Sequence, residues 1–296
     1  MNYAERQQSW GWAVAVYLFM AGMGGGLFLF SFILDCMGMY GPVAAIGALL
    51  GPVLAVIGTL FLLIDLGSIF KAYRLFSSAS TFMTSWMVRG TWILSAFIIF
   101  ALAYALPSFP LFEWLPWGQQ STLRQVIGVV AALLSILVMV YPGFLLGVLK
   151  SIPLWNTPAL PLLFFLSGLD NGIAALIALG LLFPGSFALT GFHLLGAGDV
   201  VLVSLLLIVL GAYIEIVRQA GETAAASIRL LKTPLFISGV LIAGLLIPLG
   251  LLIYGFFVTH AVALRFLSGS TSILLLAGGL LGRYSIIRAG VHTAVR

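Results

Sequence analysis

The chain has little of three residue types on which soluble proteins and electron carriers depend. Its 296 residues include one cysteine, three histidines and only 7% charged residues. The single cysteine, Cys36, excludes a disulfide framework and any cysteine-ligated zinc or iron–sulfur site within this chain. An average soluble domain devotes roughly a quarter of its residues to charge. Water is therefore excluded as the main solvent of this protein.

The histidines are too few and too poorly placed for a haem that spans a membrane. Such a haem usually needs two imidazoles that face each other from inside the helices. Here His193 is expected near an outer span end, His260 in an outer turn and His292 in the C-terminal tail. We expect neither a haem nor an iron–sulfur cluster in this chain, so any cluster must come from a partner.

Apolar residues make up 62% of the chain, and apolar stretches of 20 or more residues recur from end to end. Each is long enough to cross a bilayer as an α-helix, whereas the strands of a membrane barrel would alternate apolar and polar residues. We predict an all-α integral membrane protein whose first helix is retained rather than cleaved as a signal peptide. The eight predicted transmembrane helices cover roughly residues 12–37, 43–73, 85–105, 122–149, 156–182, 187–217, 233–258 and 262–288.

Positive charge is distributed unevenly between the two sides that these spans define. Eight spans place both termini on one side, together with the loops after spans two, four and six. The opposite loops have only Arg124 and Arg265 nearby. The positive-inside rule therefore predicts cytoplasmic termini, and the absence of a basic stripe argues for membrane lipid rather than nucleic acid as the partner of these charges. The basic residues predicted on the cytoplasmic side are Arg6, Lys71, Arg74, Lys150, Arg218, Arg229, Lys232, Arg288 and Arg296.

A faint internal repeat, at an offset of about 145 residues, pairs segment 21–26 with segment 167–172. Because this offset covers four spans, the two halves would have the same orientation. We predict two four-helix bundles, an N-terminal bundle over residues 1–150 and a C-terminal bundle over 151–296. Small residues that allow close helix packing would produce the same match without duplication, and both explanations stay open.

Carboxylates inside the spans are costly, at least ~2.5–3.5 kcal/mol each on insertion scales. Asp170 and Asp199 are predicted at the same depth near mid-membrane, where two carboxylates that met would share a proton. One interpretation is a proton relay of Asp170, Asn171 and Asp199, with Glu215 nearer the cytoplasm. The other is a pair of carboxylates that are simply satisfied by Asn171 or backbone.

A further charged pair is predicted in the first half of the chain. Asp65 precedes the second cytoplasmic turn by about as many residues as Arg89 follows it. A structural salt bridge between them is the favoured role, and a place on a proton path is the alternative.

Polar residues gather at the outer ends of spans one, three and four. Asp35 closes span one, Tyr104 closes span three, and Arg124 and Gln125 open span four. The adjacent segment 106–118 is rich in proline and tryptophan, which suits the membrane interface. This segment is either an aromatic belt or a portal for a lipid-soluble ligand with a docking surface.

Short motifs dispersed along nearly the whole chain form a recognisable set. They are Trp10-Gly11-Trp12, Tyr17-Leu18-Phe19, glycines 22 to 26, Asp65-Leu66-Gly67, Tyr141-Pro142-Gly143, Trp155-Asn156-Thr157-Pro158 through Pro161, Ser167-Gly168 and Arg283-Tyr284. In these motifs the chain resembles the NrfD/PsrC family of membrane subunits. Some relatives place a histidine among the glycines of span one, where this chain has Met23-Gly24-Gly25-Gly26.

The resemblance implies eight helices in two bundles, no haem, and a quinone site near the outer face. It also implies a docked iron–sulfur subunit on the extracytoplasmic face and usually a molybdopterin-type catalytic subunit. The host would be a bacterial or archaeal cytoplasmic membrane, and the quinone menaquinone or ubiquinone. Asp35, Tyr104, Arg124 and Gln125 are the expected quinone-binding residues, with Asp35 exchanging a proton.

Three functions follow from these observations. The leading hypothesis is a quinone-interacting membrane anchor subunit of a respiratory oxidoreductase. Such a subunit would not be catalytic on its own, and proton translocation by it is left open. A proton-coupled secondary transporter is the second, suggested by the repeat and the mid-membrane carboxylates, although the two halves are not inverted. A passive membrane anchor is the third.

Overall fold

The structure is a computed structural model that describes residues 7, 10–39, 41–66, 85–112, 114–118, 121–183 and 189–292. Within these ranges the elements are helical, as predicted. Long helices form because no water is available in a bilayer to satisfy the backbone, and an α-helix satisfies it within one segment. The helices are α1 (Trp12–Cys36), α2 (Gly41–Leu66), α4 (Trp86–Ala105), η2 (Leu106–Ser108), η3 (Pro110–Phe112), α5 (Thr122–Gly147), α6 (Ala159–Leu182), α7 (Leu189–Gln219), α8 (Glu222–Leu231), η4 (Leu235–Leu246), α9 (Ile247–Gly255) and α10 (Ala261–Arg288).

Eight of the described helical segments are long and apolar enough to cross a membrane, which confirms the predicted number of spans. Helices η4 and α9 together make the seventh span, and the short α8 lies between the sixth and the seventh. The predicted end of span two, with Lys71 and Arg74, falls outside the described residues. The histidines lie where the sequence predicts: His193 early in α7, His260 at the start of α10 and His292 beyond it.

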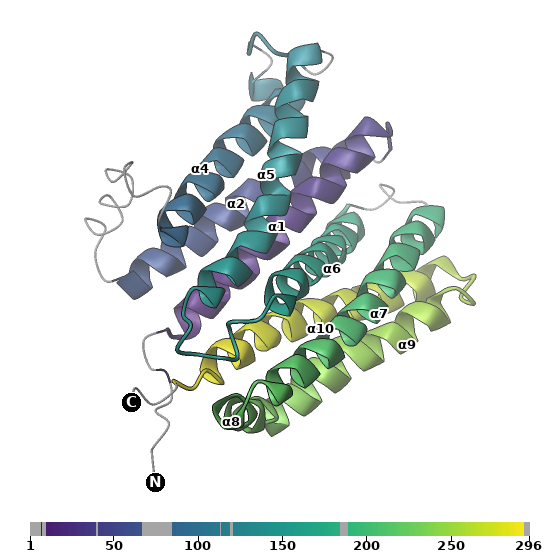
Figure 1. Cartoon of the computed structure of the whole chain (residues 1–296). Helices are drawn as coiled ribbons and strands as arrows, with labels where there is room; N and C mark the ends of the chain where they lie inside the picture. The colour runs from purple at the N-terminus through teal and green to yellow at the C-terminus, as the bar shows by residue number, and fades with distance from the viewer. Residues whose placement is uncertain are drawn as a thin grey trace.

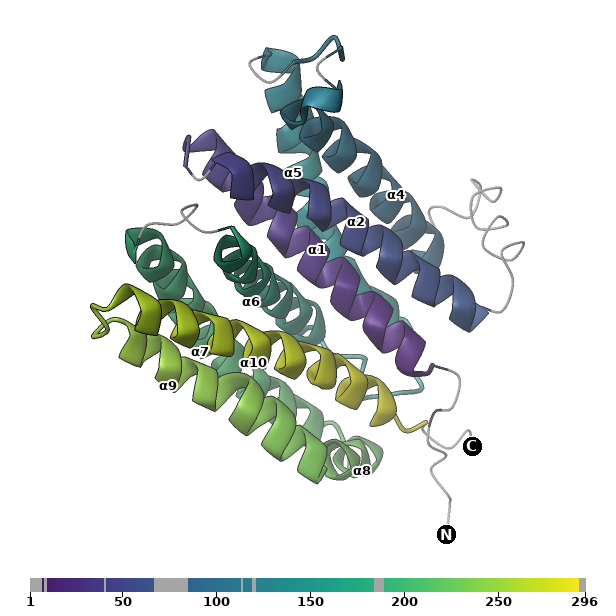
Figure 2. The ribbon, with the colours of Figure 1, turned by 180° about the vertical axis from the view of Figure 1, so that it is seen from behind.

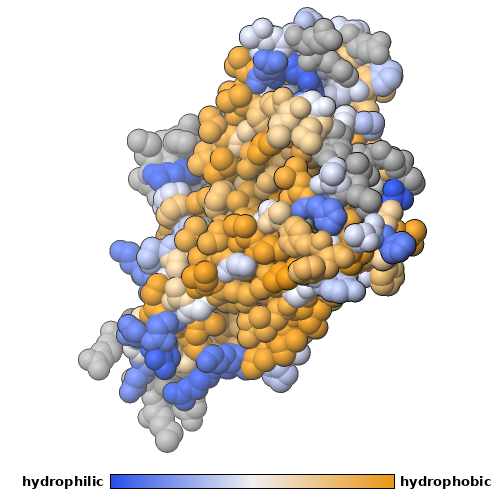
Figure 3. All heavy atoms as spheres, turned by 90° about the vertical axis from the view of Figure 1, so that its right-hand side faces the viewer, coloured by the Kyte–Doolittle hydropathy of each residue, from blue (hydrophilic) through white to orange (hydrophobic). Residues whose placement is uncertain are grey.

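The flank of the molecule is apolar, and hydrophilic residues gather toward its two ends (Figure 3). Large apolar side chains are exposed along the helices, among them Ile64, Ile99, Leu133 and Ile208, each more than half exposed. A soluble protein rarely exposes so large a contiguous apolar surface. The protein is therefore a multi-pass membrane protein.

The helices pack side by side in a layered array (Figures 1 and 2). In the first half, α1 packs on α2 and α5, and α4 packs on α2 and α5. In the second half, α10 packs on α6, η4 and α9, and α7 packs on α6 and α9. Helix α6 also contacts α1 and α5, so the halves share a broad interface, and their division into two separate bundles at residue 150 stays a prediction.

The two repeated glycine segments lie against each other where α1 meets α6. A Cβ atom on Gly26 would lie 2.1 Å from the Gly168 carbonyl oxygen, and one on Gly172 would lie 2.4 Å from the Gly26 carbonyl carbon. With Gly22 beside Gly168, this is a parallel contact between two small-xxx-small motifs. Close backbone packing thus accounts for the strongest part of the repeat.

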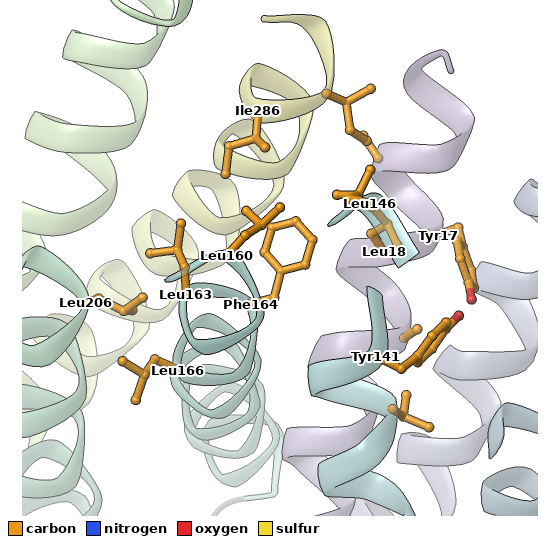
Figure 4. Close-up of a cluster of buried hydrophobic side chains, with 14 of the residues drawn as sticks. Tyr17, Leu18, Tyr141, Leu146, Leu160, Leu163, Phe164, Leu166, Leu206 and Ile286 are labelled. Atoms are coloured by element: carbon orange, nitrogen blue, oxygen red, sulfur yellow. The ribbon is translucent and has the colours of Figure 1, made fainter. Parts of the chain in front are cut away.

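Apolar side chains fill the same interface toward the end of the molecule that holds both termini. Leu18 of α1, Leu146 of α5, Leu160 and Phe164 of α6 and Ile286 of α10 are all buried there (Figure 4). At this end the Gln7 backbone N–H donates to the Gly290 carbonyl at 3.0 Å. The segments near the two termini are therefore joined. We call this end the inner end and the opposite one the outer end, after the predicted topology.

Candidate functional site

Three side chains from different helices meet at the outer end, and we call them the outer cluster: Asp35, Tyr104 and Arg124. Asp35 lies in the last turn of α1, Tyr104 in the last turn of α4 and Arg124 in the first turn of α5. They meet because these helices end or begin at the same end of the array. The predicted convergence is present in the structure.

The Arg124 guanidinium holds the outer cluster together. Its Nη2 donates to Asp35 Oδ2 at 2.9 Å and to Ser108 Oγ at 3.0 Å, and its Nε donates to the Tyr104 carbonyl oxygen at 3.1 Å. The guanidinium carbon also lies 4.2 Å from the centre of the Tyr104 ring, a cation–π distance. These contacts fix the position of a charge that would otherwise be costly to bury.

Tyr104 and Asp35 are joined directly, since the Tyr104 hydroxyl donates to Asp35 Oδ2. Both described donors to Asp35 therefore use the same oxygen. Its other oxygen, Oδ1, accepts no hydrogen bond from the described residues. The Asp35 side chain is 30% exposed, against 9% for Arg124. The cluster thus presents a carboxylate oxygen that a ligand can reach and a guanidinium that stays fixed behind it.

Local sequence explains why the cluster is rigid. Ser121 caps α5 by accepting from the Arg124 backbone N–H at 3.1 Å. Phe28 and Phe32 of α1 pack edge-on against Tyr104, with ring centres 5.8 and 5.3 Å away. Gly128 leaves the space for this packing, because a Cβ atom there would lie 2.5 Å from Phe32 and 2.6 Å from Tyr104.

The tryptophan-rich segment covers the outer end beside the cluster. Trp117 Nε1 donates to the Ala103 carbonyl at 3.0 Å, which ties the segment to the end of α4. Trp114 and Leu111 are about three-quarters exposed, at 75% and 77%. Both the belt and the portal interpretations fit such a surface.

Gln125 does not join the outer cluster. Its side chain is exposed, because the next residue along a helix is turned by about 100° from its neighbour, and Arg124 already faces inward. Ser108 takes part instead. Sequence reasoning did not name Ser108, although a hydroxyl within the proline-rich segment was a usable signal.

A second polar group lies midway along α6 and α7, buried among the helices of the second half. Asp170, Asn171 and Asp199 are 2%, 0% and 0% exposed. Asp170 and Asp199 are near enough for their charges to interact, as predicted, but no hydrogen bond joins them. Within the described residues, Asp170 Oδ1, Asn171 Oδ1 and both Asp199 oxygens have no hydrogen-bond partner. Buried oxygens without partners are rare and call for water, an ion, a ligand or a transferred proton.

Arg283 of α10 belongs to this group, and sequence reasoning did not assign it a site role. Its Nη1 donates to Ser167 Oγ at 2.8 Å and its Nε donates to the Leu18 carbonyl of α1 at 3.1 Å. It is 3% exposed, and its charge interacts with that of Asp170. Arg283 lies only five residues before the end of the last span, so by position alone it resembled an interfacial anchor.

The remaining predicted polar residues have separate neighbours. Asp65 is exposed at the end of α2, where a Cβ on Gly11 would lie 3.7 Å from its Oδ1. Arg89 stacks over Trp86 at 4.9 Å, and no salt bridge between it and Asp65 is formed in the described part of the chain. Glu215 is half-exposed and pairs with Arg218 at 2.9 Å. The structure therefore does not bring these residues to Asp170 and Asp199.

Comparisons with known proteins agree with this architecture. The family model described as "Polysulphide reductase, NrfD" matches residues 2–295. The C subunit of the polysulfide reductase of Wolinella succinogenes is 31% identical over 308 aligned positions, covering 95% of this chain and 94% of that protein. The protein NrfD of Escherichia coli is 27% identical over 194 positions, covering 58% of this chain and 60% of that protein.

Proposed function

We propose that this protein, which belongs to the NrfD family, exchanges electrons between the quinone pool and a docked iron–sulfur subunit, while the protons pass between the quinone head group and the outer aqueous phase. Its family and its eight membrane spans make it a membrane anchor of a redox complex. The Wolinella relative is, by its name, one subunit of a polysulfide reductase. Quinone exchange is the step that we add.

The convergence of Asp35, Tyr104 and Arg124 at one end of the array is the observation that carries the proposal. A quinone head group needs hydrogen-bond donors at its carbonyl oxygens and a group that exchanges protons with it. The Asp35 carboxylate supplies proton exchange through its reachable oxygen, and the Arg124 guanidinium supplies donors, while the one hydroxyl hydrogen of Tyr104 is given to Asp35. The apolar rings of Phe28 and Phe32 lie beside these groups.

Each residue of the outer cluster has a defined task in this proposal. Arg124 holds Asp35 in place and stabilises negative charge on a bound oxygen, because its own position is fixed by Ser108 and the Tyr104 carbonyl. Tyr104 positions the same carboxylate by a second hydrogen bond to the oxygen that Arg124 holds. Asp35 moves the proton between the head group and the outer aqueous phase, to which it is partly exposed.

The partners and the location complete the proposal. The iron–sulfur subunit would dock on the outer face over the exposed Trp114 and Leu111, close to the cluster, and a molybdopterin-type catalytic subunit would follow it. The membrane would be a bacterial or archaeal cytoplasmic membrane with both termini cytoplasmic. Menaquinone or ubiquinone would be the substrate, and this protein would hold no haem and no iron–sulfur cluster.

The test compares quinone-linked turnover in the complete complex with turnover that uses artificial dyes. Asp35→Asn and Arg124→Leu should lower the quinone-linked rate by about 100-fold or more, the lower end of what general acid–base groups contribute. Dye-linked activity and assembly should stay at wild-type levels. Arg265→Leu is the matched control, because it removes an exposed arginine from the same end of the array outside the cluster. Wild-type quinone turnover in both cluster variants would refute the proposal.

Proton translocation through the second half is a second candidate, favoured by the unpartnered oxygens of Asp170 and Asp199. Asp199→Asn and Asp170→Asn should preserve turnover at the outer cluster while lowering the protons moved per electron pair in proteoliposomes. Proton movement without quinol would instead indicate a transporter. Assembly without any quinone-linked turnover in the wild type would indicate a passive anchor.

A further inference from the structure

A cavity lies among α6, α7, η4 and α10, in the inner half of the second group of helices. Its enclosed volume is about 50 Å³, and the empty volume counted together with the open space at its mouth is about 510 Å³. Its long walls are apolar, with Leu206 and Leu210 of α7 on one side and Phe236 and Val240 of η4 on another. Three polar residues, Ser167, Asp170 and Arg283, also line it. Apolar walls with a few placed polar groups are the usual composition of a small-molecule site.

Helix η4, which forms one wall of this cavity, has an unusual winding. Its twelve residues make a π-helix, which is rare and is often found at functional sites. Gly244 of η4 packs directly on Gly278 of α10, since a Cβ atom on Gly244 would lie 2.6 Å from the Gly278 Cα. Residues of α6, α7 and α10 line the cavity together with η4.

The polar residues of the cavity present one acceptor and one donor. Asp170 Oδ1 is buried and has no hydrogen-bond partner among the described residues. Ser167 Oγ accepts from Arg283 at 2.8 Å and from Asn171 at 3.2 Å, which leaves its hydroxyl hydrogen able to donate. The two residues are three apart on α6, so they are neighbours on one face of the helix.

Charge and polarity select the kind of occupant. The side chains of Arg283 and Asp170, which are of opposite charge type, both line the cavity, so the polar residues favour a neutral head group over an anionic phospholipid. A file of waters is disfavoured, because each buried water needs 2–4 polar partners and the long walls offer none. A bare acyl tail would leave Asp170 Oδ1 without a donor.

We propose that this cavity binds a second isoprenoid quinol, distinct from the one at the outer cluster. One ring hydroxyl donates to Asp170 Oδ1 and accepts from Ser167, and the tail lies along Leu206, Leu210 and Phe236. This rests on the proposed function in one respect, that quinol is the lipid-soluble ligand this protein meets. The site binds the quinol, and no electron transfer is assigned to it.

The test is photolabelling of the intact complex in membranes with an azidoquinone that has been reduced to the quinol, followed by mass-spectrometric mapping of labelled peptides. The wild type should carry label both near residues 104–125 and within η4 or α10. Gly282→Leu should reduce the inner label by about tenfold, equivalent to roughly 1.4 kcal/mol. Its side chain would enter the cavity, and the only contact of its Cβ atom would be Val240 Cγ1 at 3.5 Å.

Gly211→Leu is the matched control and should keep both labels, because a Cβ atom on Gly211 meets nothing within 4 Å and Gly211 lies outside the cavity lining. If Gly282→Leu does not assemble, Leu210→Phe narrows the same cavity and should give the same loss. The inference would be overturned if the wild type carried no label within η4 or α10. It would also be overturned if that label persisted in an assembled Gly282→Leu or Leu210→Phe variant. Label within η4 or α10 but not near residues 104–125 would refute the proposed function alone. Label near residues 104–125 but not within η4 or α10 would refute this inference alone.

Discussion

Substituting Gly172 with alanine should destabilise the contact between the two halves of the protein. The added Cβ atom would lie 2.4 Å from the Gly26 carbonyl carbon and 2.6 Å from both the Gly26 Cα and the Leu27 nitrogen. All three atoms belong to the backbone of α1, so no side-chain rotation can relieve the overlap. Helices α1 and α6 must separate at this point.

The size of the effect follows from these distances. Carbon atoms in contact are best placed about 3.5–4.0 Å apart, so the helices must move apart by roughly 1 Å. Overpacking of this kind typically costs about 1–3 kcal/mol. In folded domains each kcal/mol shifts the unfolding midpoint by about 2–4 °C. Relative to Gly211→Ala, which gains the same helix propensity without the overlap, Gly172→Ala should therefore lower the midpoint by roughly 2–12 °C.

The assay is thermal unfolding in a fixed detergent, followed by intrinsic tryptophan fluorescence. Gly211→Ala is the control, because it adds the same methyl group to a helix where nothing lies within 4 Å. Alanine is the better helix former by about 1 kcal/mol, so this variant should unfold at or above the wild-type temperature. Equal midpoints for the two variants would refute the reasoning that backbone contact joins the halves.

Two further predictions concern topology and cofactors. Reporter fusions after Arg296 and within the segment 106–118 should report opposite sides of the membrane, because three spans separate that segment from the N-terminal side and eight spans return the chain to it. The arginine and lysine asymmetry predicts that the side of the termini is the cytoplasm. The same side for both fusions would contradict the eight-span topology. The purified protein, separated from its partners, should show no absorption from a stoichiometric haem or iron–sulfur cluster, because it has one cysteine and scattered histidines. An absorption band from one haem per protein molecule would contradict this expectation.

Helix ends were predictable from the sequence, whereas helix rotation was not. Asp35, Tyr104 and Arg124 stand at the ends of spans that must return to the same side of the membrane, so their meeting follows from connectivity. Gln125 follows Arg124 directly, yet its side chain is exposed. A helix that is apolar all round gives no pattern from which to tell its inward face from its lipid face.

Long-range packing decided the role of Arg283. Its hydrogen bond to the Leu18 carbonyl joins residues 265 positions apart. Nothing local distinguishes such an arginine from one that anchors a helix at the interface, as Arg288 does by position. Only the packing of α10 against α1 and α6 makes it a buried partner of Ser167 and a neighbour of Asp170.

The sequence alone determined that this protein is a bundle of eight membrane-spanning helices, because a sufficiently long apolar stretch must satisfy its own backbone in lipid wherever its neighbours lie. Its resemblance to the NrfD family was also readable from dispersed residues. The tertiary structure decided which polar groups meet, which carboxylate oxygens lack a partner among the described residues, and where a cavity lined in part by the π-helix η4 lies beside Asp170. These features depend on the rotation of each helix about its own axis and on the distance to which the glycines let two helices approach. Contacts between segments far apart in the sequence determine that rotation and that distance.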